Sequence, residues 1–499
     1  MAVHKLNYTN IMTLINQIPM KKTLLLSLFL AIMISCKKQA TAVKENSSAN
    51  ESTAFNLTDD LIETGVIYEV NIRQYSPEGT FNAFTKDLDV LKELGVKVIW
   101  VMPINPISEV KRKATDGQFT SEIEDEEARK KYLGSYYSVS DYKAINPEFG
   151  DLNDFKQLVQ TAHAKGMAVI VDWVPNHTGW DHPWIKAHPG YYTQNEAGEI
   201  IDPINPETGE SWGWTDVADL NYDNMEMRKE MIADMKYWVE EADIDGFRMD
   251  VAHKVPVDFF KEALAEMRTV KAQFMLAEAE QFELLQNGFD MQYAWEMHHL
   301  LNEIAKGNAS VEEFDRYMSK TIAALSGKGI NMNFITNHDE NSWNGTLQER
   351  MPTSKALFTA LIYTMPGMPL IYSGQEYDLA HRLKFFEKDS IGKTRGRYFD
   401  LLSDLGNLKN TNAALHGGLK AGSYTRLTTN KDNQVLAFKR EKDGQEIVFV
   451  GNFKDEPIHV EFELNGEYSR FEKEESTIVG NGNTALNLPE FGYVILVKK

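Results

Sequence analysis

The sequence predicts an α/β protein built on a closed barrel of eight parallel strands, followed by a smaller all-β domain. Eight short apolar segments alternate with longer segments in which apolar residues recur at helical spacing. Near-continuous apolar strands separated by helices indicate a parallel sheet that is covered on both faces. Eight such units over roughly 340 residues favour a closed (β/α)8 barrel over an open doubly wound sheet.

The helices and strands can be placed by their ends. The helical pattern of residues 81–94 stops at Gly95, and that of residues 152–165 stops at Gly166. Glycine commonly follows the last helical turn, so both segments are predicted to be helices. The predicted strands cover residues 66–70, 96–102, 168–173, 246–249, 274–277, 289–293, 330–335 and 369–372.

Three acidic residues follow strands of this predicted barrel. Asp250 and Glu278 come directly after strands, and Asp339 ends the segment 334–339. In a (β/α)8 barrel the reactive groups lie at the carboxyl ends of the strands, where Asp172 also falls. Glycoside cleavage needs one carboxylate that attacks the sugar and a second carboxyl that protonates the leaving oxygen. The arrangement therefore predicts an enzyme.

Two insertions interrupt the alternation of strands and helices. Residues 109–133 are highly charged, and a solvated loop or helix face is the expected structure there. Residues 177 to about 222 are rich in aromatic residues that could stack on sugars or form a small core, and a core position is favoured for any single one. These residues are Trp180, Trp184, Tyr191, Tyr192, Trp212 and Trp214.

The last part of the chain has a different pattern. After about Gly417, short alternating strands such as residues 435–439, 446–450 and 493–497 predict an antiparallel β-sandwich. The predicted domains are therefore a barrel over residues 59–416, which includes the insertion at about 177–222, and a sandwich over residues 417–499.

The N-terminus predicts export. Lys21 and Lys22 precede an apolar run over residues 24–34, and Ser35 and Cys36 follow it. A charged segment, an apolar core and a small residue form a signal peptide, here residues 1–35, and the run is too short to span a bilayer. Met20 could be the true first residue, so residues 1–19 could be an N-terminal extension.

Cys36 is the only cysteine of the chain, which excludes an internal disulfide. Its surroundings resemble the lipobox of bacterial lipoproteins, although Met33 occupies a position where leucine is more usual. We therefore predict lipidation of Cys36 and anchoring in the cell envelope, with a plain secretory signal or an inert thiol as alternatives. Residues 36–58 are predicted to form a flexible tether.

Composition argues against a nucleic-acid partner. The 499 residues carry a formal net charge of -21 at pH 7, and no block of Lys and Arg forms a basic stripe. Phosphate-rich partners would be repelled by most of this surface. The acidity is better explained as keeping an exported protein soluble.

Over roughly residues 60–499, the chain resembles the α-amylase family of retaining glycoside hydrolases, family 13. Each matching segment ends a predicted strand, and their order along the chain is that of the family. The insertion and the tail resemble its domains B and C, and residues 216–221 resemble a further short motif. The four matching segments are residues 172–177, 246–250, 276–278 and 334–339.

The resemblance implies a double displacement. Asp250 would be the nucleophile and Glu278 the general acid and then base, while Glu280 is a less favoured alternative to Glu278. Asp339 would bind sugar hydroxyls. Arg248 lies two residues before Asp250 and points to the same side, so we expect its charge to hold Asp250 ionised.

Other residues match sugar-binding positions of the family. His177 and His338 match histidines that form hydrogen bonds with the sugar in the catalytic subsite. Tyr137 resembles the tyrosine that stacks under that sugar, with Tyr136 as the alternative register. Asp172 is expected to brace the site rather than react.

Three departures from the family pattern leave questions open. His253 and Lys254 stand in the reverse of the usual order, so either could contact the leaving glucan or face a helix. Asn176 matches a calcium ligand, but the other oxygen ligands of such a site cannot be placed, so a structural calcium is neither predicted nor excluded. No cofactor is needed for the chemistry. Ala279 and Glu280, the two residues after Glu278, also differ from the pair that is usual in the family.

The predicted function is retaining hydrolysis of α-1,4-glucosidic bonds in starch-like glucans or maltooligosaccharides. A neopullulanase- or cyclomaltodextrinase-like enzyme and a glucan transferase are alternatives. A non-catalytic glucan-binding barrel is the alternative from another class. The presence of all three acids favours an enzyme.

Overall fold

The computed structural model describes residues 55–115, 117–471 and 473–499. The predicted signal peptide, Cys36 and nearly all of the predicted tether therefore lie outside the described residues. The described residues form one compact unit. Within the described part of the chain, no helix is long and apolar enough to cross a membrane.

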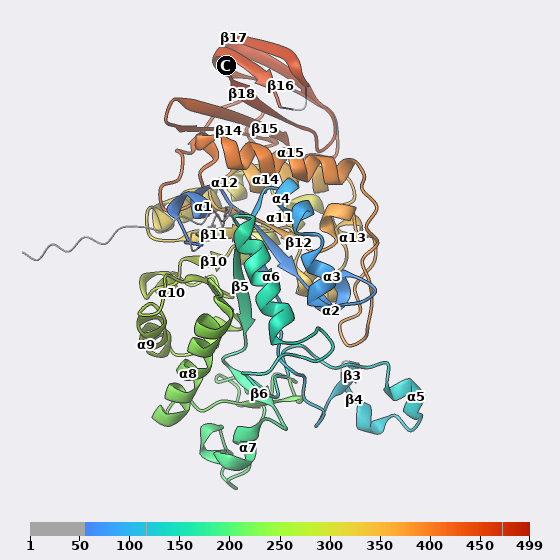
Figure 1. Cartoon of the computed structure of the whole chain (residues 1–499). Helices are drawn as coiled ribbons and strands as arrows, with labels where there is room; N and C mark the ends of the chain where they lie inside the picture. Colours follow the sequence, from blue (N-terminus) through green and yellow to red (C-terminus); the bar gives the residue numbers. More distant parts are fainter. Residues whose placement is uncertain (1–54, 116, 472) are drawn as a thin grey trace, which may run out of the picture. The chain divides into compact units, whose positions relative to one another are not determined.

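Eight parallel strands close into a barrel, which confirms the predicted fold class (Figure 1). Their order around the barrel is β1-β12-β11-β10-β9-β8-β5-β2. Each predicted strand overlaps an observed one. The strands are β1 (Val66–Val70), β2 (Val96–Val101), β5 (Ala168–Trp173), β8 (Gly246–Met249), β9 (Phe274–Ala277), β10 (Met291–Tyr293), β11 (Ile330–Asn333) and β12 (Met368–Tyr372).

Alternate side chains of these strands fill the barrel interior. Ile170 and Leu276 belong to the interior cluster, whereas Val169 belongs to the layer between the barrel and its helices. Because side chains alternate between the two faces of a strand, the interior row of β5 continues to Asp172. The row of β8 likewise reaches Arg248. The barrel core thus ends in charged side chains at the carboxyl end.

The strands β8 and β9 approach each other closely where β8 begins. Gly246 has a φ of 152°, and a Cβ at this position would lie 1.8 Å from the carbonyl oxygen of Phe274 on β9. A side chain at residue 246 would therefore force β8 and β9 apart, so this position requires glycine.

Helices surround the barrel, and several begin with a side-chain cap. Asp151 accepts hydrogen bonds from the backbone of Asn153 and Asp154 and so starts α6. The helices are α1 (Asp59–Thr64), α2 (Ile72–Tyr75), α3 (Phe81–Thr85), α4 (Leu88–Glu93), α5 (Glu126–Arg129), α6 (Leu152–Ala164), α7 (Pro183–Ala187), α8 (Met225–Ala242), α9 (Val257–Met267), α10 (Phe282–Gln286), α11 (Trp295–Ala305), α12 (Val311–Leu325), α13 (Leu347–Arg350), α14 (Lys355–Thr364) and α15 (Arg397–Thr411).

The helix predicted over residues 81–94 is divided into α3 and α4. The backbone N–H of Asp87 donates to Phe84, which closes a turn between the two helices. The Asp87 carboxylate also accepts hydrogen bonds from Tyr75 and from Lys393. These tertiary contacts fix a bend that the apolar spacing does not reveal.

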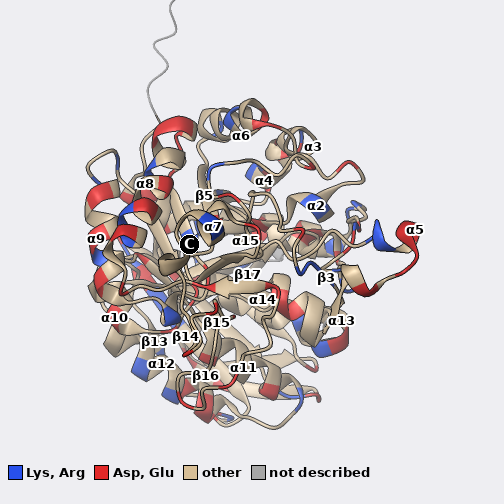
Figure 2. Ribbon diagram, turned by 90° about the horizontal axis from the view of Figure 1, so that it is seen from below, with Lys and Arg blue, Asp and Glu red and all other residues tan. Residues whose placement is uncertain are grey.

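The two insertions carry short elements of their own. The first forms the hairpin β3 (Lys113–Thr115) and β4 (Gln118–Phe119), and then α5, which buries no residue. Figure 2 shows α5 as a projecting segment that contains acidic and basic residues. The second insertion pairs β6 (His177–Gly179) with β7 (Val217–Asp219) in an antiparallel ribbon.

The C-terminal part is an antiparallel sheet of six strands, in the order β13-β14-β15-β18-β16-β17. Val448 and Val450 of β15 share a separate core with Val460 and Phe462 of β16, so the sheet folds over itself in two layers. The strands are β13 (Thr425–Arg426), β14 (Val435–Lys442), β15 (Gln445–Asn452), β16 (Ile458–Arg470), β17 (Lys473–Leu488) and β18 (Tyr493–Lys498).

Candidate active site

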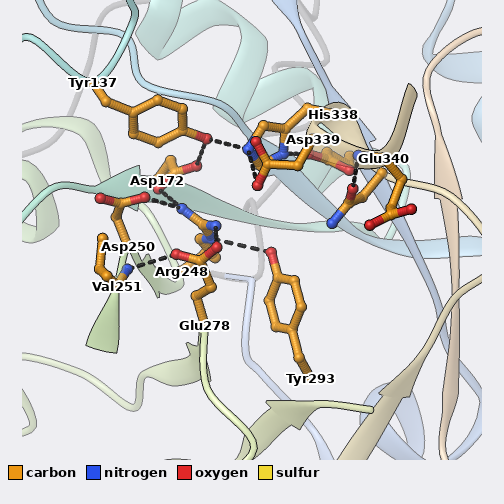
Figure 3. A network of polar contacts seen from close by, with 12 residues as sticks. Tyr137, Asp172, Arg248, Asp250, Val251, Glu278, Tyr293, His338, Asp339 and Glu340 are labelled. Atoms are coloured by element: carbon orange, nitrogen blue, oxygen red, sulfur yellow. Dashed lines mark hydrogen bonds and ion pairs between the residues drawn. The ribbon is translucent and has the colours of Figure 1, made fainter. Parts of the chain in front are cut away.

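Four polar side chains from three neighbouring strands meet at the carboxyl end of the barrel (Figure 3). Arg248 Nη1 lies 2.8 Å from Asp172 Oδ1 and 2.9 Å from Asp250 Oδ1. Its Nη2 lies 3.1 Å from Glu278 Oε1. The side chains of Arg248 and Asp172 are fully buried, whereas 16% of the Glu278 side chain is exposed. One guanidinium group therefore faces three carboxyl groups.

Aromatic side chains hold this guanidinium in place. Arg248 Nε donates to the hydroxyl of Tyr293 over 3.2 Å, and Arg248 Cζ lies 5.0 Å from the centre of the Trp100 ring. Burial alone would lower the pKa of Arg248, but the carboxylates of Asp172 and Glu278 raise it well above its ordinary value. The arginine therefore stays charged.

The contact with Arg248 does not keep the pKa of Asp250 low. Burial and the neighbouring Glu278 raise the pKa of Asp250 well above its ordinary value, and Arg248 offsets only part of this effect. Burial likewise raises the pKa of Asp172 to about 6. Arg248 does favour the ionised form of Asp250 through its charge and its hydrogen bond, as predicted, but burial and the neighbouring acids outweigh this effect on the pKa.

A strained backbone position orients Glu278. Val251 has a φ of 45°, which is unusual for a β-branched residue, and its N–H donates to Glu278 Oε2 over 2.6 Å. Val251 also precedes the short 3-10 helix η3 (Ala252–Lys254). The turn after β8 therefore places both Asp250 and a hydrogen-bond donor for Glu278.

A second network centres on His338. Its Nδ1 lies 2.5 Å from Glu69 Oε1, and its Nε2 lies 2.8 Å from the hydroxyl of Tyr137. That hydroxyl also donates to Asp172 Oδ2 over 3.2 Å. Burial lowers the pKa of His338, but the carboxylates of Asp339 and Glu69 outweigh it and raise the pKa to about 9. His338 is therefore cationic at neutral pH.

Asp339 lies further from its strand than the sequence suggests. β11 ends at Asn333, and Asp339 comes six residues later, at the start of the π-helix η4 (Glu340–Asn344). Its Oδ2 lies 3.4 Å from His338 Nε2, and 36% of its side chain is exposed. Asp339 therefore presents its carboxylate to the pocket rather than to the barrel interior.

All three predicted catalytic acids line one cavity of about 530 Å³. Its wall also contains residues from both insertions and from the segments that follow β11 and β12. The lining residues are Lys113, Ser135, Tyr137, His177, Trp212, Trp214, Asp216, Val217, Asp250, Val251, His253, Lys254, Glu278, His338, Asp339, Trp343, Phe385 and Phe386.

The structure separates several alternatives that the sequence leaves open. Tyr137 lines the cavity, whereas Tyr136 is buried and its hydroxyl accepts a hydrogen bond from Asn71. Glu280 accepts a hydrogen bond from the backbone of Glu296 at the start of α11, and it does not line the cavity. Tyr137 and Glu278, rather than their neighbours, therefore face the pocket.

The cavity is also lined by His253 and Lys254 of η3 and by His177. His177 is buried, and burial lowers its pKa to about 3, so its ring is neutral at pH 7. Both His253 and Lys254 line the cavity, and Lys254 Nζ lies 3.6 Å from the centre of the Trp212 ring.

Sequence reasoning missed several residues of the wall. Trp343 is 47% exposed, and its ring lies 5.2 Å from that of Phe385, next to Phe386. Trp343 follows Asp339 by four residues, which was a usable signal, but nothing in the sequence links Phe385 to the site. Glu69 was also missed, because it stands within an apolar strand and no motif marks it.

The surroundings of Asn176 do not fit a calcium site built from carboxylates. Asn176 Nδ2 contacts His177 Nδ1 over 3.2 Å, and its backbone carbonyl accepts from Leu220. In the described ranges, no group of three or more His, Cys, Asp or Glu side chains is arranged to hold a metal ion. A hard cation needs six to eight oxygen ligands. A structural calcium at Asn176, which the sequence neither predicts nor excludes, stays untested.

Comparison with known families identifies the fold. Residues 45–397 match the family model described as the alpha-amylase catalytic domain. This chain belongs to the α-amylase family. The family resemblance inferred from the four sequence segments is therefore confirmed.

Relatives of this α-amylase family member differ from it over most positions. Alpha-amylase 3 of Dictyoglomus thermophilum is 26% identical over 353 residues, which cover 63% of this chain and 64% of that protein. Alpha-amylase MalA of Haloarcula japonica is 25% identical over 407 residues, which cover 80% of this chain and 56% of that protein. The match thus spans less than two thirds of the length of these two relatives.

Solved structures match over nearly their full length. The maltogenic alpha-amylase AmyB of Thermotoga neapolitana has a TM-score of 0.76 and 26% identity, and the match covers 88% of this chain and 99% of AmyB. An alpha-amylase of Lactobacillus plantarum has a TM-score of 0.74 and 28% identity, with 89% and 100% covered. Both the barrel and the C-terminal sheet are therefore shared with these enzymes.

Proposed function

We propose that this α-amylase family member hydrolyses α-1,4-glucosidic bonds in starch-like glucans or maltooligosaccharides with retention of configuration. The observation that carries this proposal is the position of Asp250 and Glu278. Both carboxyl groups line one cavity, both contact Arg248, and the backbone of Val251 orients Glu278. Two acids on one pocket are what glycoside cleavage requires, and retention is what the family resemblance implies.

The proposed reaction proceeds in two steps. Asp250 attacks the anomeric carbon while Glu278 protonates the leaving oxygen, which gives a covalent glycosyl-enzyme. Glu278 then removes a proton from water, and the resulting hydroxide replaces Asp250 at the anomeric carbon. The net configuration is retained because the carbon is inverted twice.

The electrostatics of the pocket favour the transition state. Asp250 Oδ2 is buried and makes no hydrogen bond with any described residue, so its ionised form is costly. The positive charge that develops on the sugar ring would offset this cost, and it would do so only in the transition state. Asp339, His338 and His177 are proposed to bind the hydroxyls of that sugar.

Names of relatives suggest the neighbouring specificities. One relative is named cyclomaltodextrinase and another oligo-1,6-glucosidase, and AmyB is described as maltogenic. The alternatives that use the same mechanism are hydrolysis of cyclodextrins or pullulan and glucan transfer. A binding protein without catalysis is less favoured, because all three acids line the cavity.

A time course on maltoheptaose tests the proposal. The products should be shorter maltooligosaccharides, and NMR spectra of the first minutes should show the α-anomer before mutarotation. Products longer than maltoheptaose would indicate glucan transfer instead. Absence of turnover on maltoheptaose, cyclodextrin and pullulan would contradict the enzymatic function.

We also propose that the mature protein is anchored in the bacterial cell envelope through a lipid on Cys36. The support is the sequence alone: a charged segment, an apolar run and the only cysteine of the chain. Wild-type protein should incorporate a labelled fatty acid and fractionate with membranes. A Cys36→Ser variant should do neither, and equal labelling of both proteins would reject the anchor.

A further inference from the structure

One buried carboxyl group beside the cavity takes no part in the proposed reaction. Glu69 lies on β1, two residues after Ile67 of the barrel interior, so its side chain belongs to the same interior row. It is fully buried and does not line the cavity. Its Oε1 lies 2.5 Å from His338 Nδ1, whereas its buried Oε2 has no hydrogen-bond partner among the described residues. Glu69 can therefore act on the pocket through His338.

His338 connects Glu69 to the cavity, which it lines. Its Nε2 lies 2.8 Å from the hydroxyl of Tyr137 and 3.4 Å from Asp339 Oδ2. The ring of Trp100 packs against that of His338 at an angle of 85°, with the ring centres 5.9 Å apart. The imidazole thus has one nitrogen on the buried carboxyl group and the other beside the pocket.

The hydrogen bonds place a proton on both ring nitrogens of His338 when Glu69 is ionised. The hydroxyl of Tyr137 donates its proton to Asp172 Oδ2 over 3.2 Å, so its oxygen accepts from His338 Nε2. A carboxylate can only accept, so Nδ1 must donate to Glu69. A histidine that donates from both nitrogens is a cation.

Several other charged and titratable groups surround this pair. Burial and Arg248 disfavour the positive charge of His338, whereas the carboxylates favour it. The tyrosines are buried, which raises their pKa well above its ordinary value, so they stay neutral. Glu69 differs from the other carboxylates because it contacts Nδ1. The groups are Glu69 of β1, Tyr137 after β2, Asp172 of β5, Arg248 of β8, Asp339 before η4 and Tyr372 of β12.

We propose that Glu69 is a positioning residue that acts through His338, because its carboxylate holds the imidazole ring as a cation with Nε2 facing Asp339 and the bound sugar. The proposal rests on the proposed glycosidase function. A charged donor attracts a carboxylate more strongly than a neutral one. Since 36% of the Asp339 side chain is exposed, water competes for this carboxylate, and the charge of His338 keeps it beside the sugar.

The variant that tests this role is Glu69→Gln. Its amide has nearly the size of the carboxylate and can donate to Nδ1, so the ring would keep its orientation and lose its charge. NMR spectra of protein that contains ¹⁵N-labelled histidine report the protonation of each ring nitrogen, and His338→Asn assigns the signals. At pH 7 we expect a doubly protonated His338 in the wild type and a neutral ring with its proton on Nε2 in Glu69→Gln.

The consequence for the reaction is measured with α-maltosyl fluoride, because fluoride leaves without a proton from Glu278. Burial lowers the pKa of His338, but the carboxylates of Asp339 and Glu69 raise it to about 9. For the wild type, kcat/KM for fluoride release should therefore fall only near pH 9. Removal of one adjacent negative charge disfavours the cation, so in Glu69→Gln this fall should move to lower pH by about one to three units.

Glu376→Gln is the matched control. Glu376 follows β12, is also fully buried, and accepts a hydrogen bond from Tyr68, the residue before Glu69 on β1. Side chains of neighbouring strand residues point to opposite faces, so this glutamate lies on the other side of β1 from His338. Glu376→Gln should leave the His338 signals and the high-pH fall of kcat/KM where they are in the wild type.

The outcomes separate this proposal from the proposed function. A neutral His338 in the wild type at pH 7, with the shared proton on Glu69, would overturn the proposal whether or not any variant folds. Unchanged His338 signals in Glu69→Gln, an unchanged pH profile, or an equal shift in Glu376→Gln would also overturn it. No fluoride release from the wild type would overturn the glycosidase, while the NMR signals would still decide whether Glu69 holds the charge of His338.

Discussion

Replacing Asp250 with asparagine is expected to lower kcat on maltoheptaose by about 10⁴- to 10⁶-fold, as loss of a nucleophile does in other enzymes. The amide cannot form the glycosyl-enzyme, whereas its size and its contact with Arg248 are nearly preserved. Folding should therefore be little affected. The measurement is initial rates on maltoheptaose, with circular dichroism and thermal unfolding of the same preparation.

Glu278→Gln provides the matched comparison, because this residue acts on both steps of the reaction. Cleavage of maltoheptaose should fall by about 10²- to 10⁴-fold, since the leaving oxygen receives no proton. Fluoride needs no such help, so α-maltosyl fluoride should release about one equivalent of fluoride rapidly and then continue slowly. A variant of Asp250 that retained this burst would show that another residue is the nucleophile.

Replacing Arg248 with leucine should lower the free energy of unfolding by about 3 to 5 kcal/mol at pH 7, because it strips the partner from buried carboxylates. Asp172 and Asp250 are 0% and 8% exposed, so water compensates poorly for the loss of the guanidinium. The loss would appear as a lower midpoint of urea unfolding.

The decrease in the free energy of unfolding of Arg248→Leu should depend on pH in a defined direction. Burial already raises the pKa of Asp172 to about 6, and removal of Arg248 would raise it further. An acid whose folded-state pKa is raised binds its proton more tightly in the folded protein, so stability is present at low pH and is lost as pH rises. The variant should therefore be closest to the wild type near pH 4 and weakest above pH 6.

Arg316→Leu is the control for this experiment. Arg316 pairs with Glu312 on the surface of α12, where the two side chains are 62% and 77% exposed. Such a pair contributes less than about 1 kcal/mol. If both arginine variants lost the same stability, or if the loss in Arg248→Leu did not change with pH, the shared-charge description of the site would be wrong.

The barrel could be predicted from the sequence because each strand is a short apolar run with a clear end. Gly246 to Met249 and Phe274 to Ala277 were placed correctly, and alternation along those strands fixed the side to which Arg248 points. The acids followed from this, since the carboxyl ends of parallel strands meet at one edge. The local sequence pattern was sufficient to predict those parts of the site that lie at strand ends.

The rest of the pocket comes from contacts between distant segments, which local pattern does not record. Lys113 looks like one charge among many in its insertion, and only the fold shows that it reaches Asp216. Glu69 looks like an isolated acid in an apolar strand until β1 closes the barrel beside His338. The reversed order of His253 and Lys254 left open whether either residue reaches the pocket, and the structure shows that both line the cavity.

The net pKa shift of Asp250 could not be predicted for a similar reason. Pairing Arg248 with Asp250 from their spacing was correct as a contact, but the spacing could not show that Asp172 and Glu278 share the same guanidinium. Burial of several acids around one base is a property of the assembled barrel. The direction of the Asp250 pKa therefore had to come from the structure.

The close approach of β8 and β9 at Gly246 has a consequence for evolution. Asp250 follows β8 and Glu278 follows β9, so the gap between the two strands helps to set the separation of the two acids. A mutation to alanine at residue 246, at the far end of β8 from the cavity, would widen that gap. Selection for the spacing of the acids would thus also act on a residue that touches no substrate.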